Sequence, residues 1–530
     1  MLSTHLLVRS LLWSAIVWAE YQANDPSDAL FSAAEIPRIH IQVEREPLDK
    51  LKADPRNYVK ATLREDDRVT VAAVKLKGAA GSFRDWDDRP ALTLNMRKFN
   101  KGGSFHGLVK FHLNNSVQDE TYLHERLCSE LFRQAGIPAP RVTHARVWLN
   151  GRDVGLYVLR EGFDRPYLKR SFPDPTGNLY DGGFCQDIDA DLEKDEGSGP
   201  DDRSDLRAVV AAASDPDPTS RLRRVESLVD MDAFLTFMAM ERMTCHWDGY
   251  TNTANNYRIY FDPRRGKAIF LPHGMDQMFG DPEMGLFDPT DKIVAAVVMR
   301  SEALRRRYRE RLEKLIPLMS PADGLLRRVD EIDRRLRPVL EAIDRDRATR
   351  REAQVAEFKQ HLVARAASLR RQIAEPEEAL QKFDDRGVAS LEGWFTASEC
   401  EKAVHEEVET HAGKKALSIR AGEGEPCVAS WRRHVLLGPG QYTIQADVRT
   451  DRVVKLDDTD RSGVGVGISG VERDQHLHGT TASQTLSYRF RIPDERKDVV
   501  LVLELRARSG QVWFERSSIR LIREDAAGVR

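Results

Sequence analysis

The spacing of apolar residues changes from a helical to a strand period near residue 375. This change predicts two parts with different secondary structure. Before it, Leu123, Leu127 and Leu131 recur every four residues, which is typical of one face of an α-helix. After it, leucines within residues 501–505 recur every second residue, which is typical of a half-buried β-strand. The sequence therefore predicts an α+β fold in which an all-β part follows a part with both helices and strands.

The length of 530 residues is enough for about two to four domains, since roughly 100–200 residues form one domain. We expect a first domain at 36–374, with a strand-rich lobe at 36–203 and a helical lobe at 204–374. Residues 375–390 form the predicted linker. Residues 391–530 contain many short alternating segments separated by glycine turns, so we expect a β-sandwich there.

Turn-forming residues give the expected boundaries of elements in the first domain. A strand is expected at 91–99 and a helix at 121–135, with Asp119 as its N-cap. The Asn-Gly pair at 150–151 predicts a tight hairpin. Residues 173–204 are rich in Asp, Gly and Pro and predict a long surface loop.

Two later segments also read as strands. Residues 257–261 and 268–271 form an expected pair joined by a turn, and residues 511–522 form an expected last strand after a turn at Ser509 and Gly510. The first pair directly follows a polar loop, so its ends are candidate positions for functional side chains.

The first 23 residues have the pattern of a signal peptide, with an apolar run at 11–19 and small residues at Ala19 and Ala23. We expect an exported protein, in the periplasm, outside the cell or at its surface; a packed N-terminal helix is the alternative. No later segment approaches the roughly 20 apolar residues of a membrane helix, so no membrane span is expected.

Charge and cysteine content restrict the classes of partner and metal site. The chain has 81 basic and 84 acidic residues, a balance that gives no reason to expect a nucleic-acid partner. Its five cysteines form no CxxC pair, which argues against a structural zinc site. Export would permit a disulfide between Cys400 and Cys427, and five free thiols remain the alternative.

Polar residues at the ends of predicted elements suit phosphoryl transfer. Asp248, Asn256 and Asp276 follow in the order in which a protein kinase places its catalytic acid and its two metal ligands. One carboxylate orients the attacking hydroxyl, and hard oxygen ligands hold Mg²⁺ against the nucleotide phosphates. The spacings differ from the kinase pattern, Asn255 is a rival to Asn256, and turn formation is the alternative role for each residue.

A zinc site is a further alternative. His246 and His273, together with Asp248 and Asp276, could bind a transition metal for hydrolysis. We rank this below phosphoryl transfer, because the sequence has no closely spaced histidine pair, and because both histidines could instead shape their loops.

Several short stretches occur in the same order in a known family. They lie at 78–82, 89–94, 105–107, 113–119, 130–140, 149–157, 246–250 and 272–280. On these stretches, residues 36–370 resemble the spore coat protein H (CotH) kinase family. The resemblance implies a divergent, atypical protein-kinase-like fold, ATP with Mg²⁺ or Mn²⁺, and phosphorylation of Ser or Thr on secreted or coat proteins.

The resemblance also implies roles for single residues. Asp248 matches the catalytic acid, Asn256 and Asp276 match the metal ligands, and Glu161 falls where a kinase has its nucleotide hinge. Arg89 stands where the family usually has a lysine that could pair with phosphate oxygens, and the two cations are not interchangeable. The alternative cations are Lys75, Lys77 and Lys98, and their candidate acidic partners are Glu125 and Glu130.

The alternative function is non-enzymatic. The chain could be an inactive coat or cell-surface component that binds polysaccharide through its C-terminal β-sandwich. Trp394, Trp431 and Trp513 could form aromatic sugar-binding platforms there, although burial in the core is the alternative for each of them.

Overall fold

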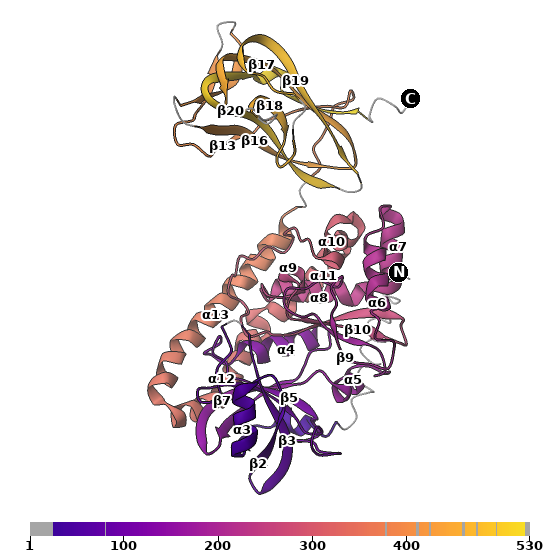
Figure 1. The fold of residues 1–530 in the computed structure, drawn as a ribbon, viewed down its shortest axis with the longest axis vertical. Helices are drawn as coiled ribbons and strands as arrows, with labels where there is room; N and C mark the ends of the chain where they lie inside the picture. Colours follow the sequence, from indigo (N-terminus) through magenta and orange to yellow (C-terminus); the bar gives the residue numbers. More distant parts are fainter. Residues whose placement is uncertain are drawn as a thin grey trace. The chain divides into compact units, whose positions relative to one another are not determined.

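The computed structural model describes residues 25–79, 81–376, 379–409, 413–422, 426–457, 462–472, 475–493 and 496–524. The expected signal peptide therefore lies outside the described residues. The chain divides into two compact units that meet in sequence at Glu375 and Pro376 (Figure 1). Within the described ranges, no helix combines the length and the apolar character that crossing a membrane requires.

The N-terminal strands of the first unit close into a barrel. The strands are β1 (Arg38–Gln42), β2 (Val59–Glu65), β3 (Arg68–Lys77), β4 (Ala91–Asn95), β5 (Lys110–Asn114), β6 (Val142–Leu149) and β7 (Arg152–Glu161). Their order is β1-β2-β3-β4-β5-β7-β6, and a parallel pairing of β1 with β6 closes the barrel. Alternating apolar residues such as Ile39, Val74 and Leu94 are buried inside it, as the period of two along a strand requires.

Helices make up most of the remaining first unit. They are α2 (Asp28–Ser32), α3 (Arg45–Ala53), α4 (His124–Gln134), α5 (Arg165–Ser171), α6 (Ser204–Ala213), α7 (Pro218–Leu228), α8 (Met231–Met243), α9 (Tyr250–Thr253), α10 (Ile293–Arg300), α11 (Glu302–Leu315), α12 (Leu326–Ile343) and α13 (Arg345–Ala374). Short η1 (Ile316–Met319) and η2 (Pro321–Leu325) precede α12. Residues of α4 and α8 share one core, and every apolar side chain of α8 except Ala233 is fully buried there. The long helix α13 packs against α12 (Figure 1).

Two expectations for the first unit were wrong in part. The strand expected at 91–99 ends at Asn95, because the Asn95 side chain accepts hydrogen bonds from the next backbone N–H groups and turns the chain. The loop expected at 173–204 contains β8 (Leu179–Asp181) and β9 (Glu193–Glu196). Strand β8 pairs with β10 (Tyr257–Asp262), which in turn pairs with β11 (Lys267–Pro272). This pairing between distant segments has no local signal in the sequence.

The expected helix at 121–135 starts later than its proposed cap. Helix α4 begins at His124, and Asp119 instead accepts hydrogen bonds from the backbone N–H groups of Thr121, Tyr122 and His124. Asp119 therefore fixes the turn before the helix and does not occupy the N-cap position. Gly136 ends the helix with a positive φ of 86°, as expected for a glycine stop.

The second unit consists of strands around one core. They are β12 (Val388–Ser390), β13 (Phe395–Ser398), β14 (Val404–Glu409), β15 (Lys415–Ala421), β16 (Cys427–Leu437), β17 (Gly440–Lys455), β18 (Gly463–Ile468), β19 (Gly479–Ile492), β20 (Lys497–Glu515) and β21 (Arg520–Arg523), with a short η3 (Arg516–Ser518). The first part of β20 pairs with β16 and β18, and its last part pairs with β15 and β17. The prediction of a β-rich C-terminal part is confirmed.

The turn expected at Ser509 and Gly510 is instead a bend within β20. Gly510 has a φ of 108°, and the pairing of β17 with β20 shifts its register next to this position. A side chain at Gly510 would meet the Arg452 carbonyl oxygen at 2.5 Å, so only glycine lets the two backbones approach this closely. The bend lets one strand serve both parts of the sheet.

Trp394 and Trp431 lie in the core of the second unit, with 9% and 7% of their surface exposed. Each indole N–H donates to a backbone carbonyl, of Leu391 and Ser418 respectively. Both side chains are therefore unavailable as sugar platforms, and the core role proposed for them is confirmed.

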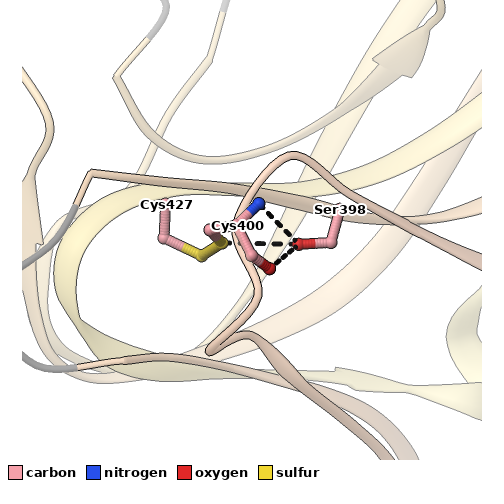
Figure 2. Close-up of a disulfide and its surroundings, with 3 residues drawn as sticks. All are labelled: Ser398, Cys400 and Cys427. Carbon is pink, nitrogen blue, oxygen red and sulfur yellow. Dashed lines mark hydrogen bonds between the residues drawn. A yellow bond between two sulfur atoms is a disulfide. The ribbon is translucent and has the colours of Figure 1, made fainter.

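A disulfide joins Cys400 and Cys427, so the pairing weighed from the sequence is present (Figure 2). The two Cα atoms lie 5.3 Å apart, within the usual range for a disulfide. Ser398 accepts a hydrogen bond from the Cys400 backbone N–H at 3.1 Å and donates to its carbonyl at 2.7 Å. The disulfide therefore ties the end of β13 to the start of β16.

We expect replacement of both disulfide cysteines, Cys400→Ser with Cys427→Ser, to lower the free energy of unfolding of the second unit by about 3 kcal/mol. The disulfide closes a loop with a sequence separation of 27 residues, and its loss restores chain entropy to the unfolded state. Denaturant unfolding with and without a reducing agent measures the effect. Cys185→Ser, which changes an exposed free cysteine, is the control. Equal unfolding of the wild type in both conditions would contradict the prediction.

Candidate functional site

The loop between α8 and α9 presents Asp248 as a half-buried carboxylate. Its Oδ2 accepts a hydrogen bond from Asn256 Nδ2 at 2.7 Å, and its Oδ1 accepts from Asn255 Nδ2 at 3.0 Å and from Thr253 Oγ1 at 3.3 Å. The structure therefore brings Asp248 and Asn256 together. Asn255, the rival for the ligand role, is buried and bound to the same carboxylate.

Asn256 stands at the start of β10 in a left-handed conformation with a φ of 48°. Pairing of β10 with β11 sets it opposite His273, whose backbone N–H donates to the Asn256 carbonyl at 2.9 Å. A Cβ at Gly274 would lie 2.3 Å from Asn256 Oδ1, so glycine is needed for the Asn256 side chain to fit. The backbone at His273 and Gly274, two residues before Asp276, therefore lies next to Asn256.

Asp276 follows β11 in a negatively charged, half-buried environment. Burial, reinforced by the negative charge of Glu125, raises the pKa of Asp276 to about 6, against the opposing effect of the Lys77 ammonium. An ionised Asp276 is thus only weakly favoured in the protein alone. A cation at this carboxylate would remove that cost, which is how a metal-binding carboxylate behaves.

Lys77, at the end of β3, is a half-buried cation whose charge interacts with Asp276. Its Nζ donates to Asn114 Oδ1 at 2.6 Å. Burial and the Arg160 guanidinium lower the pKa of Lys77, whereas Glu125 and Asp276 raise it, and the result is a pKa of about 7. An anionic ligand at this position would restore the charged form.

Glu125 on α4 connects this lysine to β7. One carboxylate oxygen accepts from Asn114 Nδ2, and the other lies 3.4 Å from Arg160 Nε. Arg160 Nη2 in turn contacts His273 Nε2 at 3.2 Å, and His273 Nδ1 contacts Asn256 Oδ1 at 3.4 Å. The contacts form one polar chain, which runs in the order Lys77, Asn114, Glu125, Arg160, His273, Asn256 and Asp248.

The structure distinguishes between the candidate cations Lys75, Lys77 and Lys98 and between the candidate acids Glu125 and Glu130. Lys75 and Lys98 lie over the ring of Tyr58, at 4.9 and 5.2 Å from its centre. Glu130 binds Arg328 instead, at 2.6 Å. Lys77 and Glu125 are therefore the members of these two sets that reach the polar chain.

Glu161 lies outside the polar chain. Its carboxylate is buried and accepts from Arg141 Nη2 at 2.9 Å and from Arg170 Nη2 at 2.6 Å. Burial opposes ionisation, but Arg170 and Arg141 outweigh it and lower the pKa of Glu161 to about 2. The side chain is therefore held in an ion-pair network that also includes Asp25 and Asp28.

Arg89, predicted to pair with phosphate, is not brought to the polar chain. Its Nη2 donates to the Tyr122 hydroxyl at 2.8 Å and to the Leu156 carbonyl. Its guanidinium also lies over the rings of Tyr122 and Tyr157, 5.6 and 5.3 Å from their centres. The guanidinium thus points into a separate cavity.

Sequence reasoning missed Glu241, which holds the Asp248 loop in place. This carboxylate on α8 is fully buried and accepts from the backbone N–H groups of Tyr250 and Thr251, both at 2.9 Å. Burial raises its pKa to about 7, although these hydrogen bonds lower it. In the sequence, Glu241 is an acid near the end of a mostly apolar helix, which is a weak signal of function. Its role is therefore visible only in the structure.

The two histidines do not form a zinc site with the acids. In the described part of the chain, no three side chains among His, Cys, Asp and Glu converge on a common metal position. Burial lowers the pKa of His246 to about 4, and burial together with Arg160 also lowers that of His273. Both rings are neutral at pH 7 and help to shape the loops that carry Asp248 and Asp276.

The donor types near this loop are those that a hard divalent cation such as Mg²⁺ or Mn²⁺ would use. Asp276 and Asn256 offer a carboxylate and an amide oxygen, which are donors that these hard cations prefer. Two protein ligands suffice when phosphate oxygens and water complete the coordination. The raised pKa of Asp276 comes first from its burial and then from the negative charge of Glu125.

We expect Glu241→Ala to lower the free energy of unfolding by about 2–4 kcal/mol, because two buried N–H groups lose their acceptor. The pKa of Glu241 is raised in the folded state, so its protonated form contributes stability that is lost as pH rises through about 7. The variant should lack this part of the pH dependence. Denaturant unfolding between pH 5 and 9 measures both effects, with the exposed Glu313→Ala as control.

Comparison with known proteins identifies the family. A family model described as CotH kinase protein matches residues 74–379, more than half of the chain. Invasin CotH2 of Rhizopus delemar is 28% identical over 189 residues, which cover 32% of each chain. Inner spore coat protein H of Bacillus subtilis is 23% identical over 261 residues, which cover 44% of this chain and 70% of that protein.

This chain spans about a third of the length of the Rhizopus relatives that it matches, including invasin CotH7 at 27% identity over 183 residues. Among solved structures, TmCBM61 in complex with β-1,4-galactotriose is 16% identical to this chain, with a TM-score of 0.18. The match covers 25% of this chain and 88% of the TmCBM61 chain. Because the family model covers more than half of the chain, we conclude that this protein belongs to the CotH kinase protein family.

Proposed function

We propose that the first unit is an atypical kinase that transfers the γ-phosphoryl group of ATP to Ser or Thr hydroxyls of secreted or surface proteins. The observation that supports this most is the polar chain, which connects the half-buried Lys77 on the barrel to Asp248 among the helices. Asp276 lies close enough to Lys77 for the two charges to interact. A kinase needs this combination of a cation, a metal-binding acid and a hydroxyl-orienting acid.

The residues have separate roles in the proposal. Asp248 accepts the hydrogen bond of the attacking hydroxyl, and its two asparagine donors fix its orientation. Asn256 and Asp276 hold Mg²⁺ or Mn²⁺, which would offset the charge of the phosphate oxygens. Lys77, and not Arg89, pairs with phosphate oxygens, because it is the one of the candidate cations Arg89, Lys75, Lys77 and Lys98 that reaches the polar chain.

An exported location is part of the proposal. The names of two relatives, an invasin and an inner spore coat protein, describe proteins of a surface or coat. The apolar run at 11–19 has the composition of an export signal. A substrate protein with accessible Ser or Thr at the cell surface fits this location.

We expect ATP with Mg²⁺ or Mn²⁺ to raise the unfolding temperature of the wild type and not that of Asp276→Asn. A ligand at 100 times its Kd stabilises the folded state by about 2.7 kcal/mol, which a thermal scan resolves. The raised pKa means that ionised Asp276 costs stability above about pH 6, so the metal-free variant should be at least as stable as the wild type at pH 7.5.

The pH dependence gives an internal check. Metal binding requires the carboxylate, so the shift produced by ATP with metal should grow as pH rises from 5 to 7. Asp385→Asn, an exposed acid in the second unit, is the matched control and should respond as the wild type does. If the unfolding temperature of the wild type does not change with either metal at millimolar ATP, the kinase proposal is wrong.

A second candidate function is polysaccharide binding by the second unit. A hollow of about 160 Å³ on its surface is lined by Arg432, Gly467, Glu504 and Arg506, together with apolar residues such as Val502. Arg506 donates to both carboxylate oxygens of Glu504, at 3.0 and 3.2 Å. Phe395, which is 43% exposed, is paired in register with Arg432 and could stack on a sugar ring.

We expect Arg432→Ala to abolish retention of the protein on an insoluble polysaccharide, if this hollow is the binding site. The guanidinium is the donor that a sugar hydroxyl would use, so its loss should reduce affinity at least tenfold. Affinity electrophoresis across neutral and acidic polysaccharides measures the effect. The exposed Arg491→Ala on β19 is the control, and equal retention of both variants would exclude the hollow.

A further inference from the structure

A cavity of about 150 Å³ lies in the first unit between β7, α12 and the start of α13. Its walls include the apolar side chains of Leu156, Leu340 and Ile343. Three arginines also line it: Arg89, Arg347 and Arg351. A cavity of this size with several guanidinium groups requires an account of how their charges are balanced.

Arg89 makes several contacts, but none of the acidic side chains that the structure describes forms an ion pair with it. Tyr122 and the Leu156 carbonyl accept from its Nη2, and the rings of Tyr122 and Tyr157 flank the guanidinium. Its Nε is shielded from solvent and makes no hydrogen bond within the described residues. A buried donor of a charged group is costly to leave unpaired, so a ligand that accepts from it would be stabilising.

Arg351 differs, because its charge is already balanced. Its Nη1 donates to Asp333, and its Nε and Nη2 donate to the Thr121 carbonyl at 3.0 and 2.7 Å. It therefore lines the cavity without contributing an unbalanced charge. The excess positive charge comes from the two other arginines.

Arg347 lies in the first turn of α13 and is half-buried. Among the described residues its side chain forms no ion pair or hydrogen bond, while its backbone N–H donates to the helix cap Asp344 at 2.9 Å. The other acid at the cavity, Asp153, binds Arg146 at 2.6 Å and accepts from the Gly155 N–H. Neither acid of the cavity neutralises Arg89 or Arg347.

We propose that this cavity binds a phosphate group, held between Arg89 next to the barrel and Arg347 on α13. Planar guanidinium groups match the oxygens of phosphate. The site differs from the polar chain, since Leu156 and Arg160 stand four residues apart on β7, or about 13 Å along the strand. The inference does not depend on phosphoryl transfer.

Inorganic phosphate is the probe that tests the proposal. We expect it to raise the unfolding temperature of the full chain in a saturable manner, beyond the effect of NaCl at the same ionic strength. Arg347→Gln should weaken the apparent phosphate affinity at least tenfold, and it should fold normally because this side chain has no protein partner among the described residues. Arg350→Gln, an exposed arginine of the same helix, is the matched control and should bind as the wild type does.

Two further measurements separate this site from others. Lys77→Met should keep the phosphate effect, because Lys77 belongs to the polar chain; loss of the effect in Lys77→Met with retention in Arg347→Gln would overturn the proposal. Sodium acetate should act no more strongly than NaCl, and an effect equal to that of phosphate would overturn the choice of phosphate. The proposal also fails if phosphate stabilises the wild type no more than NaCl does.

Discussion

The first unit depends on charges that are buried and must therefore be paired with one another. Arg160 and Glu125 are each 2% exposed in their side chains, and they lie where the barrel meets α4. A buried charge left alone is strongly destabilising, so each of these residues requires the others in place. The polar chain thus fixes β7, α4 and the loop after β11 relative to each other, and the candidate catalytic residues receive their positions from it.

The same requirement bears on the phosphate-binding role that we propose for Lys77. A lysine with a pKa near 7 gains its charge when an anion binds, whereas an exposed lysine is charged and hydrated beforehand. Asp276, with a pKa near 6, shows the opposite preference and gains from a cation. A metal nucleotide brings both charges at once, which makes the two perturbed groups complementary to one ligand.

Arg89 shows how the chemistry of a guanidinium decides which groups it contacts. A guanidinium is larger than an ammonium and can stack on tyrosine rings while it donates to carbonyl groups. In this chain it does so with Tyr122, Tyr157 and Leu156, and the last two lie in the middle of the barrel strand β7. These contacts keep Arg89 away from the polar chain and place it at a separate cavity.

Local periodicity and turn chemistry were enough to predict the change from mixed to β-rich structure, the pair β10 and β11, and the hairpin at Asn150, because neighbouring residues encode them. The order of polar residues along the chain was enough to group Asp248 with Asn256. It took the folded chain to show that Lys77 and Glu125, among several candidates, reach the polar chain, that β8 pairs with β10, and that Glu241 accepts hydrogen bonds from the Asp248 loop. Those outcomes depend on which side chains become buried together across long sequence separations, and burial, unlike periodicity, is a property of the folded chain as a whole.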